Sequence, residues 1–397
     1  MTRQVLIAGG GMGGLAAAVA CIRAGWDARL YEQAAQFSEV GAGIQLGPNA
    51  TRILDDWGLD GALSAVAAFP QRLRVRSALD GTQLGLMRLG SAFTKRYGAP
   101  YATVHRADLQ ALLLDAARRA GVYLKLSSPV TAVLPFGDAV GLRIGEGREV
   151  EGDALVGADG LWSVVRPHVY GDGPPAFTGH LAYRALTAQR DLPEALRSAD
   201  VTVWLGARLH VVAYPVRCGE QLNVVAIVEG TVPGPAQDWD QCAVAAELQA
   251  AIAAQCTQLR DLVLAMPHWR LWALHDRPPM GSADEMVRGR VVLVGDAAHP
   301  MRPYFAQGAG MAIEDAAELG RAFAMAAKAG VDVPLALRRY ALNRWERCAR
   351  VQARSRRNGR IFHATGLMQW GRDLSLRLLG EHLLDQQWLY RGPAEQH

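Results

Sequence analysis

The order of apolar and polar residues over the first 32 positions predicts one strand–helix–strand unit. Gln4–Ala8 is a short apolar run, and Leu15–Ala24 is an alanine-rich segment that ends at Gly25, where a glycine favours the end of a helix. Asp27–Tyr31 is a second apolar run that ends at Glu32. We therefore expect two parallel strands joined by a crossover helix.

Later segments change between the strand period and the helical period. From Tyr183 to Glu229 the apolar positions tend to recur at every second residue, which is typical of antiparallel strands with one buried face. A continuous apolar run, Val291–Val294, indicates a fully buried strand. The other predicted elements are strands at Leu73–Leu79, Asp153–Val156, Val201–Trp204, Leu209–Val216 and Leu222–Val228, and helices at His105–Ala120, Asp238–Leu264, Ala341–Gly359 and Asp373–Leu384.

This order predicts an α/β fold in which a Rossmann-type domain is interleaved with a sheet-rich domain and followed by C-terminal helices. The Rossmann-type domain is expected to comprise residues 1–72, 99–179 and 281–345. The sheet-rich domain is expected at 73–98 and 180–280, and the helical region at 346–397.

Composition limits the class of protein. The chain has 397 residues, half of them hydrophobic, which suits two or three domains with a large core. The net charge of +4 is spread along the chain, and the arginine-rich stretch 344–357 is typical of a solvated helix face, so we expect no nucleic-acid partner. The five cysteines include no CxxC pair, which favours a reducing cytoplasm over disulfides or a metal site. We expect neither a signal peptide nor a membrane span, because no apolar run reaches about 18–20 residues.

Two glycine-containing turns indicate a dinucleotide site. Gly9–Gly14 lies between the first strand and its helix: Gly9 permits the tight turn, Gly11 lets backbone approach a pyrophosphate, and Gly14 lets the helix pack on the strand. Glu32 follows where an acid binds ribose hydroxyls. Gly295–Pro300 follows the apolar run Val291–Val294 and leads into a helical pattern. This arrangement can hold a sugar hydroxyl and point backbone N–H groups at an electron-rich ring.

Two other glycine-containing segments have an ordinary alternative. Gly157–Gly160 follows a short strand, and an Asp-Gly pair of this kind is usually only a turn. Gly41–Asn49 is a glycine-punctuated segment, in which Asn49 is a candidate cap for the next helix; the alternative is an ordinary loop.

These motifs resemble the three fingerprints of single-component FAD-dependent aromatic hydroxylases, which have the fold of para-hydroxybenzoate hydroxylase. The matching residues are Gly9–Gly14 with Glu32, Gly157–Gly160 with Arg166, and Gly295–Pro300 with Ala306–Asp315. The resemblance covers nearly the whole chain, and the last two fingerprints are specific to the group. Within it, the chain is most similar to salicylate and 3-hydroxybenzoate hydroxylases and to 6-hydroxynicotinate monooxygenase.

The resemblance implies a tightly bound FAD and NADH or NADPH as a transient co-substrate. It assigns the adenosine ribose to Glu32 and the ribityl hydroxyls to Asp296, and it makes Gln33 a further cofactor-binding residue. Arg106 would contact the FAD linker, although an arginine at a helix start is more often a surface charge. The other implied cofactor residues are Asp159 between FAD and NAD(P)H, Gly43 and Pro300 beside the isoalloxazine, and Gly308, Ala309, Gly310 and Met311 at a helix N-terminus that faces the pyrimidine edge.

The implied reaction reduces FAD with NAD(P)H, forms a flavin hydroperoxide with dioxygen and attacks an electron-rich ring carbon. A phenol needs its proton withdrawn, so the protein must supply a base. His210 and Tyr214 are four residues apart on a predicted strand and share one face, separated by about 13 Å. The resemblance makes His210 the base and Tyr214 its positioning partner; the alternative is an ordinary histidine and tyrosine of a sheet.

The substrate pocket is predicted from fewer signals. Gln45 fits the benzoate-type relatives, whereas the nicotinate enzyme has a histidine there and another where this chain has Tyr304. Arg184 and Arg302 are candidates for a substrate carboxylate because a guanidinium binds it with two parallel hydrogen bonds, although each can equally be structural. Tyr183, Trp204 and Met301 are candidates for the lining of the pocket, although aromatic and methionine residues more often fill a hydrophobic core.

We therefore expect an FAD- and NAD(P)H-dependent monooxygenase that hydroxylates a phenolic acid of the 3-hydroxybenzoate or salicylate type. The alternatives are an N-heteroaromatic acid of the 6-hydroxynicotinate type, a natural-product phenol, a flavin oxidase that does not hydroxylate, and an FAD-binding interaction module. The expected partners are a small aromatic substrate and dioxygen, and the expected state is a cytoplasmic monomer or homodimer. The ring position, decarboxylation and the choice between NADH and NADPH stay open.

Overall fold

The computed structural model describes residues 3–37, 42–231, 241–242, 245–328 and 330–393. The chain forms two compact units, and each of them is built from three separate stretches. Unit 1 comprises residues 1–39, 109–176 and 276–355, and unit 2 comprises 40–108, 177–275 and 356–397. The sequence-based division is likewise interleaved, but it assigns residues 40–72 and 99–108 to the first domain, whereas the structure groups them with unit 2.

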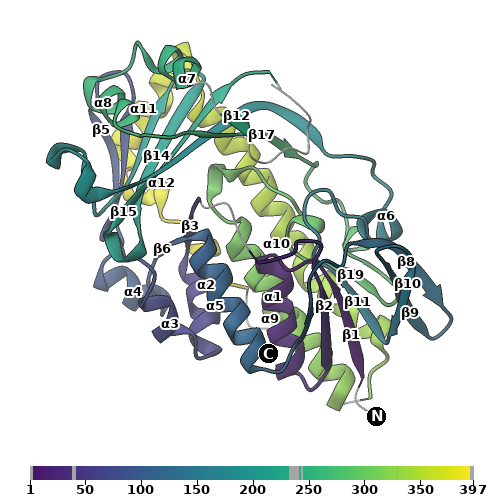
Figure 1. The fold of residues 1–397 in the computed structure, drawn as a ribbon. Helices are drawn as coiled ribbons and strands as arrows, with labels where there is room; N and C mark the ends of the chain where they lie inside the picture. The colour runs from purple at the N-terminus through teal and green to yellow at the C-terminus, as the bar shows by residue number, and fades with distance from the viewer. Residues whose placement is uncertain (1–2, 38–41, 232–240, 243–244, 329, 394–397) are drawn as a thin grey trace. The chain divides into compact units, whose positions relative to one another are not determined.

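Unit 1 contains a parallel sheet with one antiparallel edge strand. The strand order is β18 (Val287–Arg288), β19 (Val291–Leu293), β11 (Ala154–Gly157), β1 (Gln4–Ala8), β2 (Asp27–Tyr31) and β7 (Tyr123–Lys125), with β18 antiparallel to β19. Helices α1 (Met12–Arg23) and α9 (Gly308–Lys328) pack against each other beside this sheet (Figure 1). The predicted strand–helix–strand unit is therefore confirmed, and its helix begins three residues earlier than predicted.

A second, three-stranded antiparallel sheet completes the strands of this unit. Its strands are β8 (Val130–Phe136), β9 (Ala139–Ile144) and β10 (Arg148–Gly152). The remaining helices are α5 (Arg106–Arg119), α6 (Arg166–Val169) and α10 (Val333–Phe362), of which α5 and α10 also contribute residues to unit 2.

Unit 2 is organised by an eight-stranded sheet. Its order is β16 (Gln241–Cys242), β17 (Arg270–Asp276), β12 (Ala176–Ala188), β15 (Gln221–Glu229), β14 (Leu209–Val216), β13 (Val201–Gly206), β4 (Arg72–Ser77) and β5 (Gln83–Arg88). Strands β12, β15, β14 and β13 are antiparallel neighbours, as their period of two predicts. The other elements are β3 (Gly43–Leu46) paired with β6 (Ala102–His105), and helices α2 (Pro48–Asp56), α3 (Asp60–Ser64), α4 (Ser91–Tyr97), α7 (Ala245–Ile252), α8 (Thr257–Leu264), α11 (Gly366–Leu379), α12 (Glu381–Leu384) and α13 (Gln387–Tyr390).

Three local predictions were wrong. The glycine-punctuated segment is not a loop throughout, because residues 43–46 form β3; Gly41 lies outside the described residues. Gly47, not Asn49, is the N-cap of α2, because Pro48 takes the first helical position. The predicted helix Asp238–Leu264 is interrupted in its described part, where the backbone N–H of Cys256 donates to Ala78 on a distant segment instead of continuing a helical ladder.

Candidate active site

The nucleotide-binding motifs of unit 1 meet at one edge of its parallel sheet. Strands β2, β1, β11 and β19 are adjacent and run in the same direction, so their carboxyl ends lie side by side. Glu32 follows β2, Gly9–Gly14 follows β1, Asp159 follows β11 and Gly295 follows β19. Ligands of open parallel sheets bind at this edge.

The glycine-rich turn has the geometry that a pyrophosphate requires. A Cβ on Gly14 would lie 2.0 Å from the carbonyl oxygen of Gly9, so only glycine lets α1 pack this closely on the turn. A Cβ on Gly11 would meet nothing within 4 Å, so the backbone there is open to a ligand. Gly11 is also the N-cap of α1, and no side chain caps the helix. Backbone N–H groups at such a helix start bind phosphate.

Glu32 is held in place by the same turn. Its carboxylate accepts hydrogen bonds from the backbone N–H of Gly10 at 2.6 Å and of Ala34 at 2.8 Å. Gln33 is exposed beside it. The acidic group is therefore fixed at the end of β2, where an adenosine ribose would bind in a dinucleotide site.

Asp159 and Arg166 hold the turn after β11. The carboxylate of Asp159 accepts hydrogen bonds from Ser163 Oγ at 2.6 Å and from the N–H of Val164 at 2.7 Å, so it orders the chain before α6. The buried Arg166 donates to the carbonyls of Ala297 and Ala298 at 3.0 and 2.6 Å. These bonds join the second fingerprint to the turn that follows β19.

The turn after β19 exposes one acidic group among buried neighbours. Asp296 is exposed, whereas Gly295, Ala297 and Pro300 are buried. The carbonyl of Pro300 accepts a hydrogen bond from Gln352 at 3.0 Å. The carboxylate of Asp296 can therefore reach a ligand hydroxyl while the turn that carries it stays fixed.

The start of α9 offers open backbone without an acidic neighbour. A Cβ on Gly308 would meet nothing within 4 Å, and the first turn of α9 carries no acidic residue. Ala309, Gly310 and Met311 are buried behind it. Unit 1 therefore has the features that a dinucleotide requires. The backbone at Gly11 is open to a phosphate group, the carboxylates of Glu32 and Asp296 can bind sugar hydroxyls, and the start of α9 can face an electron-rich ring.

In unit 2, strand register places the predicted catalytic residues on one face of the sheet. Paired residues of antiparallel strands share a face, as do residues two apart along a strand. His210 pairs with Ile227, Tyr214 with Asn223, and Arg184 with Val225. The three partners on β15 are spaced two residues apart, so they share one face of the sheet. His210, Tyr214 and Arg184 therefore lie on that same face.

Tyr183 and Trp204 lie on the opposite face. Tyr183 pairs with Ala226, and Trp204 pairs with Val211. Each of these partners is next in sequence to a residue of the polar face, so Tyr183 and Trp204 point to the other side of the sheet. They belong to the hydrophobic core that packs against α7 and α8. The structure therefore supports the alternative interpretation of these two residues, as part of a hydrophobic core, because their positions along the strands point away from the polar face.

Tyr214 sits in a corner formed with β3. A Cβ on Gly43 would lie 2.4 Å from the ring of Tyr214, so glycine is required for this close approach. The N–H of Gly43 donates to Asn223 Oδ1 at 2.7 Å, and Tyr101 Oη donates to Gln45 Oε1 at 2.7 Å. Burial raises the pKa of Tyr214, although Arg184 and Gln45 oppose the shift, so its hydroxyl stays protonated and can donate a hydrogen bond.

The two predicted carboxylate-binding arginines differ in their partners. Arg302, in unit 1, forms an ion pair of 2.6 Å with Asp276. Arg184 stacks on the ring of Trp272, with its guanidinium carbon 4.3 Å from the centroid, and no carboxylate of the described residues forms an ion pair with it. Burial and the charge of Arg106 lower the pKa of Arg184 to about 10, so it remains a cation at neutral pH.

His210 is buried at the other end of this face. Its Nδ1 lies 2.8 Å from Nε2 of His363, the residue after α10. Burial, followed by the neighbouring His363 and His180, holds the pKa of His210 well below its ordinary value. The ring is therefore neutral at pH 7, which is the state that can accept a proton.

The structure also places Arg106 and Tyr304. Arg106 begins α5 in unit 2, and its backbone N–H donates to Ala42 at 2.9 Å. Tyr304 is buried in unit 1. Their assigned roles stay predictions.

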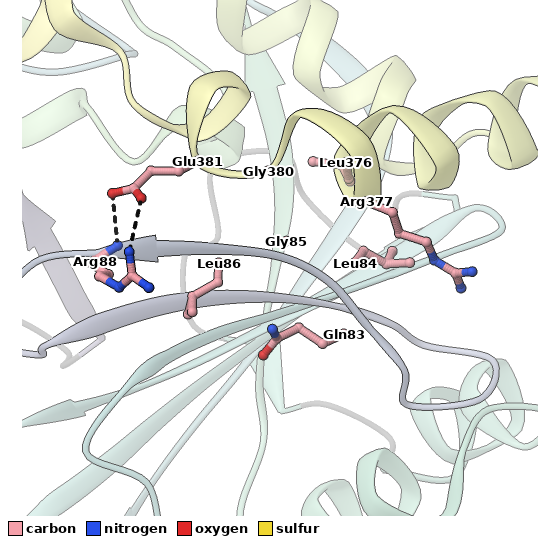
Figure 2. Close-up of a pocket in the computed structure, with 9 residues that line it drawn as sticks. All are labelled: Gln83, Leu84, Gly85, Leu86, Arg88, Leu376, Arg377, Gly380 and Glu381. Atoms are coloured by element: carbon pink, nitrogen blue, oxygen red, sulfur yellow. Dashed lines mark hydrogen bonds and ion pairs between the residues drawn. The ribbon is translucent and has the colours of Figure 1, made fainter.

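Unit 2 also has a surface cavity of about 420 Å³ between β5 and α11–α12 (Figure 2). Arg88 and Glu381 face each other across it, at 3.9 Å between Nη1 and Oε2. None of the residues predicted for catalysis or substrate binding lines this cavity. It is therefore not the candidate site.

Comparison with known proteins matches this geometry. The FAD binding domain family model matches residues 2–355. The chain is 39% identical to 3-hydroxybenzoate 6-hydroxylase of Polaromonas naphthalenivorans, over 97% of this chain and 95% of that protein. It is 38% identical to 6-hydroxynicotinate 3-monooxygenase of Bordetella bronchiseptica, over 89% and 91% of the two chains. The structure of Klebsiella pneumoniae HpxO complexed with FAD and uric acid superposes with a TM-score of 0.84 at 27% identity, covering 96% of this chain and 94% of that one.

The chain belongs to the family of FAD-dependent aromatic hydroxylases. The predicted fold class and FAD cofactor are thus confirmed. In the described residues of this hydroxylase, no helix is both long and apolar enough to cross a membrane.

Two sets of contacts that position the hydroxylase motifs could not be predicted from the sequence. Arg166 was recognised as part of a fingerprint, but its bonds to the Ala297 and Ala298 carbonyls were not foreseen. His363 was not considered at all, because it lies 153 residues from His210 and follows a predicted surface helix. The only local signal was a histidine near the end of an arginine-rich helix, which by itself is unremarkable.

Proposed function

We propose that this hydroxylase adds an oxygen atom to the ring of a small phenolic acid of the 3-hydroxybenzoate or salicylate type. The supporting observation is Arg184, a cation without a carboxylate partner among the described residues, on the same sheet face as His210 and Tyr214. Arg184 is half-buried, and its buried Nε has no hydrogen-bond partner in the part of the chain that the structure describes, so an anionic ligand would supply the missing partner.

The residues of unit 1 hold the cofactor in this proposal. Glu32 and Gln33 bind the adenosine ribose, Gly11 the pyrophosphate, Asp296 the ribityl hydroxyls, and the start of α9 the pyrimidine edge. Reduced FAD bound here would activate dioxygen, so that one oxygen atom enters the aromatic ring and the other leaves as water. NADH or NADPH is the proposed reductant, binding transiently.

The residues of unit 2 bind the substrate and move its proton. Arg184 binds the carboxylate, and the protonated Tyr214 donates a hydrogen bond that orients the ring. His210 accepts the phenol proton at Nε2, since its Nδ1 already contacts His363. Removing this proton raises the electron density of the ring and makes it reactive toward an electrophilic oxygen. Burial of His210 and Tyr214 keeps water from the reacting atoms.

An N-heteroaromatic acid of the 6-hydroxynicotinate type is the second candidate, because a relative with that name is 38% identical. The test is a panel of hydroxybenzoates, hydroxynicotinates and phenols without a carboxylate, with NAD(P)H consumption, product and hydrogen peroxide measured together. We expect product to match the NAD(P)H consumed for one phenolic acid. Peroxide without product for every compound would instead identify a flavin oxidase.

The proposal extends to the oligomeric state and the cellular location of the protein. We propose a monomer or homodimer, to be measured by light scattering. We also propose a cytoplasmic location, because Cys21, Cys218, Cys256 and Cys348 are free thiols.

A further inference from the structure

Three histidines lie in a row at one end of the polar sheet face. Nδ1 of His210 is 2.8 Å from Nε2 of His363, and the rings of His363 and His180 have centroids 4.8 Å apart. His180 pairs with Glu229, which lies two residues from the partner of His210 on β15, so these residues share a face. The row is thus assembled from two strands and the end of α10.

Exposure increases along this row. His210 is 2% exposed and His363 is 7% exposed, whereas His180 is half-buried and Glu229 is exposed. A ring nitrogen of His180, a ring nitrogen of His363 and a carboxylate oxygen of Glu229 all lie within 4.8 Å of one another. A single water molecule bridges polar atoms at such separations. Proton-binding groups therefore lead from the buried end of β14 to the solvent.

We propose that His363, His180 and Glu229 conduct the phenol proton from His210 to solvent. This inference rests on the proposed function, because it requires a phenolic substrate whose proton His210 accepts. The substrate O–H bond breaks as its proton binds Nε2 of His210, and the Nδ1 proton of His210 passes to Nε2 of His363. The Nδ1 proton of His363 then leaves through water to His180 or Glu229. Each imidazole begins and ends neutral, and no electrons are transferred.

The electrostatics explain why the proton has to move on. Burial disfavours a positive charge on His210. Burial, then His180 and Arg372, lower the pKa of His363 to about 3. A proton accepted at His210 is therefore unstable there and at His363. Glu229 is the outermost group of the row, and its carboxylate also faces the guanidinium of Arg208 at 3.7 Å.

A divalent cation at His180, Glu229 and His363 is the competing interpretation. The only carboxylate of this trio already faces Arg208, and Arg372 adds positive charge close to His363. Arg372 is itself paired with Asp373 at 2.7 Å, which weakens but does not remove this charge. The surroundings therefore suit neutral proton carriers better than a metal ion.

The experiment compares wild-type enzyme with His363→Gln, His180→Asn and Glu229→Gln, each loaded with FAD. Arg208→Gln is the control, since it lies beside Glu229 but carries no proton in the relay. Substrate Kd and the single-turnover rate of product formation are measured between pH 6 and pH 9, with the phenolic acid that the panel identifies. We expect His363→Gln to bind substrate within about threefold of wild type and to form product at least tenfold more slowly. The rate should rise with pH and recover partly with added imidazole, and the two outer variants should show smaller losses.

The outcomes separate the relay from the proposed function. If wild-type enzyme forms no product from any phenolic acid, the proposed function fails and the relay fails with it. If wild-type enzyme forms product and His363→Gln keeps its rate and pH profile, the relay alone is wrong. Should His363→Gln lose its FAD or its fold, unchanged rates in both His180→Asn and Glu229→Gln overturn the relay. Tight binding of added Zn²⁺, with activity lost on chelation, replaces it with a metal site.

Discussion

Nε2 of His299 and Oδ2 of Asp315 lie 2.5 Å apart, and both side chains are almost completely buried. Asp315 also accepts hydrogen bonds from the backbone N–H of Gly295 at 2.9 Å and from Nε of Arg344 at 2.8 Å. One carboxylate therefore ties the turn that carries Asp296 to α9 and α10. The position of the turn that carries Asp296 therefore depends on a buried network of charges.

We expect Asp315→Asn to destabilise the protein by about 3–5 kcal/mol, because it removes the counter-charge of the buried His299 and one of the two carboxylates that pair with the buried Arg344. The free energy of unfolding in urea and the affinity for FAD measure this effect, and both should fall. Asp115→Asn is the control: its partner Arg119 is exposed, at 2.9 Å, and a cost above about 1 kcal/mol is not expected. Equal stabilities of the two variants would contradict a structural role for Asp315.

The same pair predicts a pH dependence of stability. Burial alone would lower the pKa of His299, but Asp315 and Cys348 raise it well above its ordinary value. Its stabilising contribution is therefore complete below about pH 6.5 and is lost as the pH rises toward the folded-state pKa, by up to about 1.4 kcal/mol per pH unit. The pKa of Asp315 is lowered by His299 and Arg344 against the effect of burial, so its contribution is lost only in acid.

This dependence is measured as a difference. Unfolding of wild-type protein and His299→Gln is followed between pH 6 and pH 9, and the stability gap should narrow as pH rises. Other histidines are buried in the neutral form, so their contribution to the free energy of unfolding rises with pH. Both proteins contain these histidines, so their contribution cancels in the difference. A gap that widens with pH would show that His299 is neutral in the folded protein.

Gly14 and Gly13 form a matched pair for the FAD turn. A Cβ at Gly14 would collide with the carbonyl oxygen of Gly9, whereas a Cβ at Gly13 would lie 3.6 Å from Ala312, an ordinary contact. We expect Gly14→Ala to lose bound FAD and Gly13→Ala to keep it. The ratio of flavin absorbance to protein absorbance after purification gives the result. Yellow Gly14→Ala with a normal FAD affinity would show that this close approach is not needed.

Arg184→Gln tests the proposed carboxylate partner. Charged hydrogen bonds contribute about 1.5–3 kcal/mol, so the Kd for a hydroxybenzoate should rise at least tenfold, while the Kd for phenol should change little. Arg190→Gln is the control, because Arg190 is highly exposed and paired with Asp191. If Arg302→Gln produces this selective loss and Arg184→Gln does not, the carboxylate binds Arg302 instead.

His210→Ala should keep FAD and lose coupled hydroxylation, because the base is removed while the cofactor residues of unit 1 are untouched. Product per NAD(P)H consumed should fall at least tenfold, with hydrogen peroxide taking its place. His382→Gln, a change at an exposed histidine, should leave coupling unchanged. Full coupling in His210→Ala would remove this residue from the mechanism.

Residues whose signal is local could be predicted from the sequence. Glu32 and Gly295 follow apolar strands directly, and β14 has the bounds that its period of two predicted. Contacts between distant segments could not be predicted, because no periodicity reports them. Thus the pairing of His210 with His363 and the contact of Cys256 with Ala78 appear only in the structure. The choice between core and pocket for Tyr183 also needed the structure, because residue type does not reveal which face of a strand is polar.

The interleaved chain has a consequence for how this enzyme is engineered. No single cut in the gene yields either half intact, since every half collects three separate portions of the polypeptide. Truncations, split reporters and domain exchanges that assume one contiguous block would each remove part of both halves. Insertions at exposed turns within one portion are the safer route to altered versions.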